Sequence, residues 1–460
     1  MAPHPRSDQD FQEFIDNNKF SKFQWMIFAV CFLVALLDGY DTVAIGYIAP
    51  SLIQEWGIQK PDLATAMSAG LFGIAIGAIG FGPLADKLGR KIMLVISVLV
   101  FGIGTFISAY SQNLLHLEIL RFITGVGLGA AMPNAVTLLS EYCPTKRKFF
   151  LVNTMFCGFP VGAASGGFLA AWIIPEFGWQ SVLLLGGIVP VILALFLLFF
   201  VPESARYSIN KGLSQEKIKA TLSRISASAK DYTNFYLSEN INVTNESKSE
   251  GIKVILSKHY VVGSVMLWMT YFMGLIIFYG VSNWMPTLFT AANISGSLAA
   301  VVTGLFALGG LGAIANGWLM DRYNPSILIA TFFALTFITV GAIGYSVNMG
   351  TAALVLITII AGIVMNTAQS SLPSFAASFY PTAGRSTGVS WMLGIGRFGG
   401  IAGSYLVAEL IKRDMDLQQI FLILAVPAVI STCTLLVIYF KYFANKKSAT
   451  HENNKETCNA

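Results

Sequence analysis

The stretch GPLADKLGRK, Gly82–Lys91, lies between two long apolar runs and combines glycine, aspartate and a basic pair. A weaker copy, GWLMDRYN at Gly317–Asn324, lies in the same place relative to two apolar runs of the second half. A charged connection that recurs half a chain apart between apolar runs is typical of a duplicated membrane transporter. In the first copy Gly82 allows two helices to approach closely, Asp86 can accept hydrogen bonds from helix N-termini, and Arg90 holds the cytoplasmic side.

The composition excludes a soluble globular domain, because 55% of the 460 residues are hydrophobic and only 12% are charged. The apolar stretches run for about 20 residues without alternation, which favours membrane-spanning helices over a barrel. The net charge of +5 does not indicate nucleic-acid binding, because the basic residues gather on one side of the membrane. The five cysteines are scattered and give no metal-ligand spacing, so neither a metal nor a cofactor is expected.

We predict an all-α membrane protein with twelve transmembrane helices in two six-helix halves. The predicted spans are 25–48, 62–82, 92–111, 116–138, 150–174, 180–201, 259–281, 297–319, 326–346, 350–372, 386–410 and 417–441. The predicted organisation is a cytoplasmic N-terminal segment (1–24), an N-terminal half (25–202), a polar cytoplasmic linker (203–258), a C-terminal half (259–441) and a cytoplasmic tail (442–460).

The basic residues predict the orientation of these spans. Of the 29 lysines and arginines, all but five fall in the N-terminal segment, the even-to-odd loops, the linker or the tail. The exceptions are Lys60, Lys412 and Arg413 on the opposite face, and Arg121 and Arg397 inside spans. Because Lys and Arg accumulate on the cytoplasmic side, we expect a multi-pass protein of a bacterial inner membrane with both termini in the cytoplasm.

A second repeated motif closes the fourth and tenth spans. Glu141–Arg147 reads EYCPTKR and Ser378–Arg385 reads SFYPTAGR, so each half has a proline stop followed by a basic anchor at the same corner. Together with the two charged connections, these motifs predict a gate at the cytoplasmic face. The predicted gating residues are Gly82, Asp86, Gly89, Arg90, Glu141, Arg147, Asp321, Arg322 and Arg385.

Asp38 and Asp41 lie in the first predicted span and, three residues apart, share one helical face. An ionised carboxylate near the centre of a bilayer costs about 2.5–3.5 kcal/mol, so such a pair requires a protein function or a partner. Neighbouring carboxylates suit a proton carrier, because their proton affinities split and one can load near neutral pH. We therefore predict proton coupling at both. The alternative is a structural pair that caps a neighbouring helix or forms a salt bridge to Arg121.

Arg121 and Arg397 are the arginines within predicted spans. A guanidinium stays charged and forms a two-pronged contact with a carboxylate, so both are candidates for binding an anionic substrate. The alternative for each is a structural ion pair, and Arg121 has Glu118 and Asp41 as possible partners.

The tenth predicted span carries polar side chains on most faces, which is unfavourable in lipid unless they line a cavity or bridge helices. Asn366, Gln369 and Ser370 are therefore candidates for substrate binding, and Pro373 is expected to break the helix beside them. Tyr40 and Trp391 are candidates for stacking on a ring-bearing substrate, although aromatic residues more often pack helices together.

The fifth predicted span contains three glycines spaced by four residues. Gly158, Gly162 and Gly166 therefore lie on one face and are expected to allow close packing of a neighbouring helix.

The segment DGYDTVAIGYIAPSL, Asp38–Leu52, followed by GPLADKLGRK, resembles the aromatic acid:proton symporters of the major facilitator superfamily. In that family two aspartates stand at this spacing, and Arg121 and Arg397 fall at further charged positions that the family requires. The resemblance implies the twelve-helix fold, a proton as coupling ion, and benzoate, hydroxybenzoates or protocatechuate as substrates. The continuation Thr42–Leu52 looks more like hydroxybenzoate and protocatechuate carriers. One departure is Asn324, which stands in the second connection where the first has Gly89.

We interpret the chain as a secondary transporter that imports an aromatic carboxylate with one or more protons. Its expected partners are a small aromatic carboxylate, a proton and the lipid bilayer, with no nucleic acid. A transporter of another organic anion and a membrane sensor for aromatic acids remain alternatives, although no signalling domain is evident. A multidrug antiporter is disfavoured, because two buried arginines suit an anion. An enzyme is not expected, because His4, His116, His259 and His451 all lie near loops and form no catalytic constellation.

Overall fold

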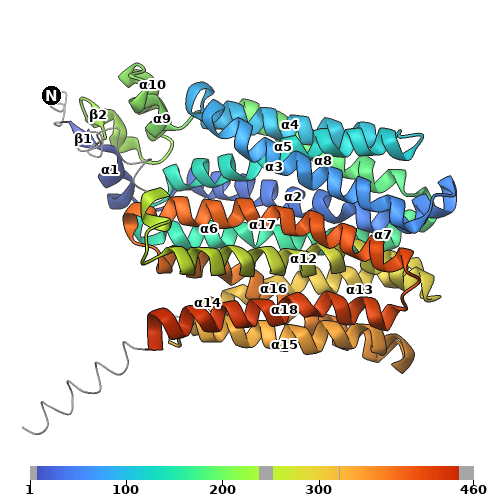
Figure 1. The fold of residues 1–460 in the computed structure, drawn as a ribbon. Helices are drawn as coiled ribbons and strands as arrows, with labels where there is room; N and C mark the ends of the chain where they lie inside the picture. The colour runs from blue at the N-terminus through green and yellow to red at the C-terminus, as the bar shows by residue number, and fades with distance from the viewer. Residues whose placement is uncertain (1–7, 238–251, 321, 445–460) are drawn as a thin grey trace, which may run out of the picture. The chain divides into compact units, whose positions relative to one another are not determined.

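The computed structural model describes residues 8–237, 252–320 and 322–444, and this part of the chain is almost entirely helical (Figure 1). Eleven helical segments of the described residues are long and apolar enough to cross a membrane. A further long helix, α17 (Thr382–Lys412), is less apolar because it contains Arg397 and several glycines. With α17 the predicted fold of twelve transmembrane helices is confirmed.

Helices are the expected outcome in a bilayer, where every backbone N–H and C=O must be satisfied within its own segment. The structure divides into two compact units, Met1–Ser51 with Ala69–Thr244, and Leu52–Ser68 with Asn245–Ala460. In chain order the elements up to the middle of the chain are β1 (Gln9–Asp10), α1 (Phe11–Asn17), α2 (Lys22–Trp56), η1 (Lys60–Asp62), α3 (Leu63–Leu88), α4 (Arg90–Ser108), α5 (Leu114–Tyr142), η2 (Thr145–Arg147), α6 (Lys148–Phe156), α7 (Gly158–Phe177), α8 (Gln180–Phe200), α9 (Ala205–Asn210), α10 (Gln215–Leu222), η3 (Ala227–Asp231) and β2 (Phe235–Tyr236).

The remaining elements belong to the second unit, which also contains η1. They are α12 (Val261–Ala291), α13 (Gly296–Leu308), η5 (Gly309–Leu311), α14 (Gly312–Met320), α15 (Pro325–Ser346), η6 (Val347–Met349), α16 (Thr351–Phe379), α17, α18 (Leu417–Tyr439) and a final π-helical turn η7 (Phe440–Ala444). Within this unit α12 packs against α13, α17 and α18, and α15 packs against α16 and α18. Helix α16 continues without a break through Pro373, so the expected break at that residue was wrong.

The first unit is organised around α4, which packs against both α5 and α8 (Figure 1). Helix α7 approaches α2 through the predicted glycine face. A Cβ atom on Gly158 or Gly162 would meet the backbone of Phe32 or Leu36, and one on Gly166 would meet the Tyr40 ring. The prediction of close packing by these three glycines is therefore confirmed. This contact fixes the part of α2 that carries the two aspartates.

We expect Gly162→Ala to lower the thermal stability of the purified protein, because the added methyl group meets the α2 backbone, which cannot move aside as a side chain can. Overpacking of this kind costs about 1–3 kcal/mol. Thermal unfolding in detergent measures the effect. Gly80→Ala is the matched control, since a Cβ there meets nothing within 4 Å. Equal melting temperatures for the two variants would contradict the assigned packing.

The charged stretch of the first half is more helical than a loop, because α3 continues to Leu88 and α4 begins at Arg90. Between them Gly89 adopts φ +103°, a left-handed conformation that favours glycine. The carboxylate of Glu203 contacts Gly89 and accepts a hydrogen bond of 3.1 Å from the backbone N–H of Lys91. In the first copy of the motif, the start of α4 is thus capped by Glu203, which follows the sixth span in the chain.

The second copy caps its helix locally. The Asn324 side chain accepts hydrogen bonds from the backbone N–H groups of Ser326 and Ile327, and Pro325 occupies the first turn of α15. The substitution of asparagine for glycine between the two copies therefore exchanges a distant cap for a local one.

A small polar assembly covers one end of the first unit. Strand β1 pairs in parallel with β2, so Gln9 faces Phe235, and the Phe14 ring of α1 packs on Phe235. The Asp16 carboxylate accepts hydrogen bonds of 2.7 and 2.8 Å from the backbone N–H and hydroxyl of Thr145. The N-terminal segment and the first part of the linker thus form one folded layer on the helix ends.

Candidate functional site

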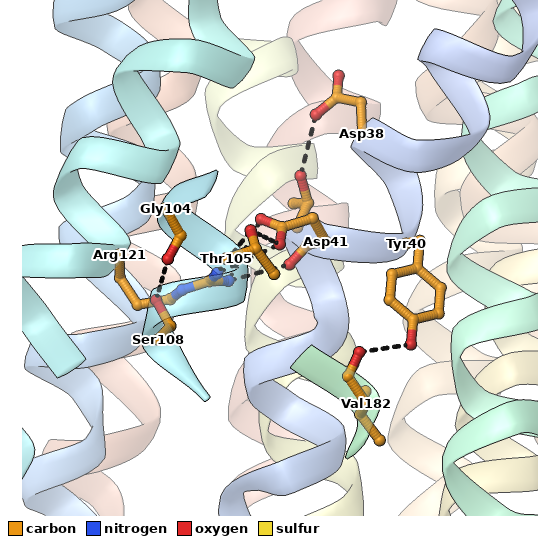
Figure 2. Close-up of polar contacts among 9 residues, drawn as sticks. Asp38, Tyr40, Asp41, Gly104, Thr105, Ser108, Arg121 and Val182 are labelled. Atoms are coloured by element: carbon orange, nitrogen blue, oxygen red, sulfur yellow. Dashed lines mark hydrogen bonds and ion pairs between the residues drawn. The ribbon is translucent and has the colours of Figure 1, made fainter. Parts of the chain in front are cut away.

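Three helices of the first unit bring a charged cluster together (Figure 2). Asp41 lies on α2, Thr105 on α4 and Arg121 on α5, and these side chains are 2%, 0% and 3% exposed. In the interior of a membrane protein such burial requires that charges be paired and hydrogen-bonded. The cluster meets this requirement through the contacts described next.

Arg121 holds the Asp41 carboxylate in a fork. Nη1 donates to Oδ2 and Nη2 donates to Oδ1, each at 3.2 Å, and Nη1 also reaches the Asp41 backbone carbonyl at 3.5 Å. Bidentate guanidinium–carboxylate pairs are among the strongest protein hydrogen bonds. Of the two partners that the sequence left open for Arg121, the structure shows an ion pair with Asp41.

Thr105 completes the cluster and was missed by the sequence analysis. Its hydroxyl donates to Asp41 Oδ1 at 2.6 Å and accepts from Arg121 Nη2 at 3.1 Å. A hydroxyl in an apolar span has no distinguishing pattern in the sequence, so only the packing of α4 reveals this role.

Asp38 lies one helical turn before Asp41 and is 8% exposed. Its Oδ1 accepts a hydrogen bond of 3.2 Å from the Thr42 hydroxyl on the same helix (Figure 2). Both predicted proton-coupling residues are therefore buried on one helix, but Asp41 carries the ion pair with the arginine.

Tyr40, a predicted substrate contact, is part of the helix packing. Its hydroxyl donates to the backbone carbonyl of Val182 on α8 at 2.9 Å (Figure 2), and its ring lies against Gly166 and Gly186. A hydroxyl that is already bonded to the backbone has little freedom to bind a ligand.

A second cluster lies in the second unit, on α12, α16 and α17. The Tyr271 ring packs against Gly396, and Arg397 lies within electrostatic reach of Tyr271. Among the residues that the structure describes, no carboxylate forms an ion pair with Arg397. The two arginines within spans thus differ, since Arg121 is paired with an aspartate and Arg397 forms no ion pair with a described residue.

The polar residues of α16 lie partly in this cluster. Gln369 is 7% exposed, donates from Nε2 to the Tyr271 backbone carbonyl at 3.4 Å, and its Oε1 has no hydrogen-bond partner among the described residues. Asn366 is buried and donates to the Phe306 carbonyl at 2.6 Å, whereas Ser370 is exposed. Of these three, Gln369 is the one that contacts Tyr271, and its Oε1 lies towards Gly274 of α12.

Trp391, predicted to stack on a ring-bearing substrate, stacks on Trp268 of α12 with ring centroids 5.5 Å apart. The Trp391 side chain remains 40% exposed. The aromatic pair therefore lies on the same two helices, α12 and α17, as Tyr271 and Arg397.

The predicted gating residues form one clear contact. Arg90 Nε lies 3.3 Å from Glu141 Oε1, and both side chains are largely buried. The guanidinium also lies over the Tyr207 ring, 5.4 Å from its centroid. Arg90 and Glu141 both belong to the predicted gate, whereas Arg147, a further member of that set, is exposed.

Of the other predicted gating residues, the structure describes the side chains of some and not of others. Arg322 is exposed and lies 3.7 Å from the centroid of the Trp318 ring, and Arg385 lies near the start of α17. Asp321 lies outside the described residues, and the same holds for the side chains at Gly82 and Asp86. In the described ranges, no group of three His, Cys, Asp or Glu side chains could hold a metal ion.

We expect Arg90→Gln and Glu141→Gln each to lower the melting temperature, because each removes one half of a largely buried ion pair. The double variant should lose less than the sum of the two, with a coupling energy of about 0.5–3 kcal/mol. A double-mutant cycle of thermal unfolding in detergent measures this. Additive losses would show that the pair contributes nothing to the folded protein.

Comparison with known proteins gives a consistent result. The family model of the Major Facilitator Superfamily matches residues 31–404. The 4-hydroxybenzoate transporter PcaK of Pseudomonas aeruginosa is 47% identical over 430 residues, which cover 93% of this chain and 95% of that protein. A gallate transporter of Pseudomonas putida is 42% identical over 95% of this chain and 96% of its own. The benzoate transport protein of Acinetobacter baylyi is 32% identical over 93% of this chain and 92% of that protein.

Solved structures support the fold alone. The xylose transporter XylE from E. coli, in a partially occluded inward open conformation, matches with a TM-score of 0.70 at 18% identity. The match covers 92% of this chain and 98% of that one.

Proposed function

Since this chain belongs to the major facilitator superfamily, we propose that it imports a hydroxybenzoate- or protocatechuate-like aromatic carboxylate by proton symport. It is a multi-pass membrane transporter, and we place it in a bacterial inner membrane with both termini and the linker in the cytoplasm, as the distribution of basic residues predicts. Relatives whose names specify 4-hydroxybenzoate and gallate support this class of substrate.

The observation that carries the proposal is the difference between the two intramembrane arginines. Arg121 is engaged in a fork with Asp41, so both of its Nη atoms already bind a carboxylate and only its buried Nε has no hydrogen-bond partner among the described residues. Arg397 forms no ion pair with any described residue and is therefore the proposed anchor for the substrate carboxylate. Gln369, which donates to the Tyr271 backbone, and the Trp268–Trp391 pair lie on α12, α16 and α17, the helices that also carry Tyr271 and Arg397.

The Asp41–Arg121 pair supplies the proposed coupling step. A proton that binds Asp41 removes the negative charge that Arg121 neutralises, so the fork weakens and the packing of α2, α4 and α5 is free to change. Release of the proton restores the pair. Asp38, one turn away on the same face, is the proposed second proton-binding group.

Proton coupling also solves an energetic problem, because a membrane potential that is negative inside opposes entry of an anion. Moving one charge across 100 mV costs about 2.3 kcal/mol. One proton for each monoanion makes transport electrically neutral and leaves the pH gradient as the drive. With more than one proton for each monoanion, net positive charge would enter, and the membrane potential would add to the pH gradient as a driving force.

A competition experiment tests the proposed substrate class. In proteoliposomes, excess unlabelled 4-hydroxybenzoate should abolish uptake of labelled 4-hydroxybenzoate, whereas 4-hydroxybenzyl alcohol, which lacks the carboxylate, should compete at least tenfold less well, about the value of one charged hydrogen bond. Equal competition by the alcohol would contradict a carboxylate site. Strong competition by aliphatic carboxylates would favour a transporter of another organic anion.

A further inference from the structure

We propose that Thr105 is a positioning residue whose hydroxyl selects the ionised form of Asp41 and turns back to its own helix when Asp41 takes up a proton. The inference rests on the proposed proton coupling at Asp41. It concerns a residue outside the set of charged side chains and begins from the hydroxyls of one helix.

Helix α4 carries three hydroxyls, and all three are buried. Ser97 donates to the backbone carbonyl of Met93 at 2.6 Å, and Ser108 donates to that of Gly104 at 2.7 Å. This is the ordinary arrangement, in which a helical Ser or Thr bonds to the carbonyl four residues earlier. Thr105 departs from it, because its hydroxyl donates across to Asp41 on α2.

The hydrogen bonds of Thr105 have a fixed direction while Asp41 is ionised. An ionised carboxylate only accepts and a guanidinium only donates, so the hydroxyl must give its proton to Asp41 Oδ1 and accept one from Arg121 Nη2. The bond that the hydroxyl donates to Oδ1 is stronger when Asp41 is ionised, so it favours a charged Asp41.

Protonation of Asp41 Oδ1 changes this direction, because the neutral acid becomes a donor towards Thr105. The Thr105 hydroxyl proton then needs another acceptor. The carbonyl of Phe101, four residues earlier in α4, occupies the place that Met93 and Gly104 occupy for the two serines. Rotation of one hydroxyl proton thus connects the two protonation states without moving a helix.

The threonine methyl group holds the hydroxyl in place. Its Cγ2 lies 3.4 Å from the position that a Cβ on Gly186 of α8 would occupy, in the same niche as the Tyr40 ring. A threonine in a helix divides between two χ1 rotamers, and here the observed one places the methyl group beside Gly186 and directs Oγ1 towards Asp41. The shape of the side chain and its hydroxyl therefore have separate roles.

Other ionisable groups near Asp41 bear on its protonation. Helix α5 presents Arg121, with Glu118 one turn earlier, and α2 itself presents Asp38 and Tyr40. Helix α8 contains no ionisable residue. The ionisable residues of α4 lie at its start, and in α7 Glu176 lies near the end and Cys157 comes just before the first residue. Neutral Thr105 thus acts beside one fixed cation and one nearby carboxylate.

The test is the pH profile of uptake of labelled 4-hydroxybenzoate into proteoliposomes. Thr105→Val keeps the branched shape and removes the hydroxyl, so the ionised carboxylate loses one donor. The pH at which uptake falls to half its maximum on the alkaline side should rise by about one unit, because the neutral form of Asp41 is then relatively favoured. Thr105→Ser restores the hydroxyl and should return the profile towards that of the unaltered protein.

Ser108→Ala is the matched control, since it removes a hydroxyl of the same helix that bonds only to its own backbone. Its profile should not move. An unchanged or lowered half-maximal pH in Thr105→Val, or an equal shift in Ser108→Ala, would overturn the inference. If Thr105→Val does not reach the membrane, Thr105→Ala compared with Thr105→Ser makes the same distinction.

Failure of this inference is distinguishable from failure of the proposed function. If Asp41→Asn abolishes concentrative uptake while Thr105→Val leaves the profile in place, only the role of Thr105 is wrong. If Asp41→Asn still concentrates substrate, the proton-coupling role of Asp41 itself is wrong.

Discussion

Replacement of Asp41 with Asn is expected to abolish concentrative uptake while substrate exchange across the membrane continues. Asparagine has nearly the shape of a protonated aspartate, so the variant imitates one protonation state permanently and cannot release a proton. It also leaves Arg121 without its carboxylate, although Thr105 and the asparagine oxygen still offer acceptors. Net accumulation of labelled 4-hydroxybenzoate in proteoliposomes, compared with exchange between equal concentrations on both sides, measures the difference.

Asp62→Asn is the control for this prediction, because Asp62 is an exposed carboxylate in η1 outside the cluster. It should accumulate substrate normally. Asp38→Asn separates the two aspartates, since a loss confined to Asp41→Asn would leave Asp38 with a structural role. Accumulation against a gradient by Asp41→Asn, with normal sensitivity to an uncoupler, would exclude Asp41 as the coupling residue.

Arg397→Lys is expected to weaken substrate binding by about 1.5–3 kcal/mol, which corresponds to roughly 10- to 150-fold in affinity. Lysine keeps the positive charge but loses the planar fork that matches a carboxylate. Because Arg397 has no ion pair with a described residue, the change should act on the substrate rather than break an internal salt bridge. Equilibrium binding of labelled 4-hydroxybenzoate to the purified protein measures the affinity.

Arg413→Lys provides a matched control beside the end of the same helix. Arg413 forms an exposed ion pair with Glu409 at 2.9 Å, which contributes little to stability and lies away from the Arg397 cluster. Its variant should bind substrate normally. Unchanged affinity in Arg397→Lys and Arg397→Gln would move the anchor elsewhere and remove the main support for the assigned roles of the two arginines.

Much of the fold is predictable because its determinants are local. Long apolar runs predict spans, and the spacing of Gly158, Gly162 and Gly166 predicts a packing face without knowledge of the partner. The structure adds that the partner is α2, through Phe32 and Leu36. The break expected at Pro373 failed because a proline removes only one hydrogen bond, and the surrounding helix of α16 is long enough to continue.

The candidate site was predictable in its charges and not in its connections. Asp41 and Arg121 are conspicuous in apolar spans, but the sequence left Arg121 a choice between Asp41 and Glu118. Thr105 and the cap that Glu203 provides for α4 depend on which helix faces meet in three dimensions. In the sequence, Thr105 resembles the other neutral residues of its span, and Glu203 resembles the other polar residues of the linker.

The most direct test of the account is uptake of labelled 4-hydroxybenzoate into proteoliposomes that contain only this protein, under an imposed inward proton gradient. We predict accumulation above the external concentration, which collapses when an uncoupler is added and is absent when the pH is equal on both sides and no potential is applied. Accumulation that persists with the uncoupler, or uptake that only equilibrates under every gradient, would contradict proton-coupled import of an aromatic carboxylate.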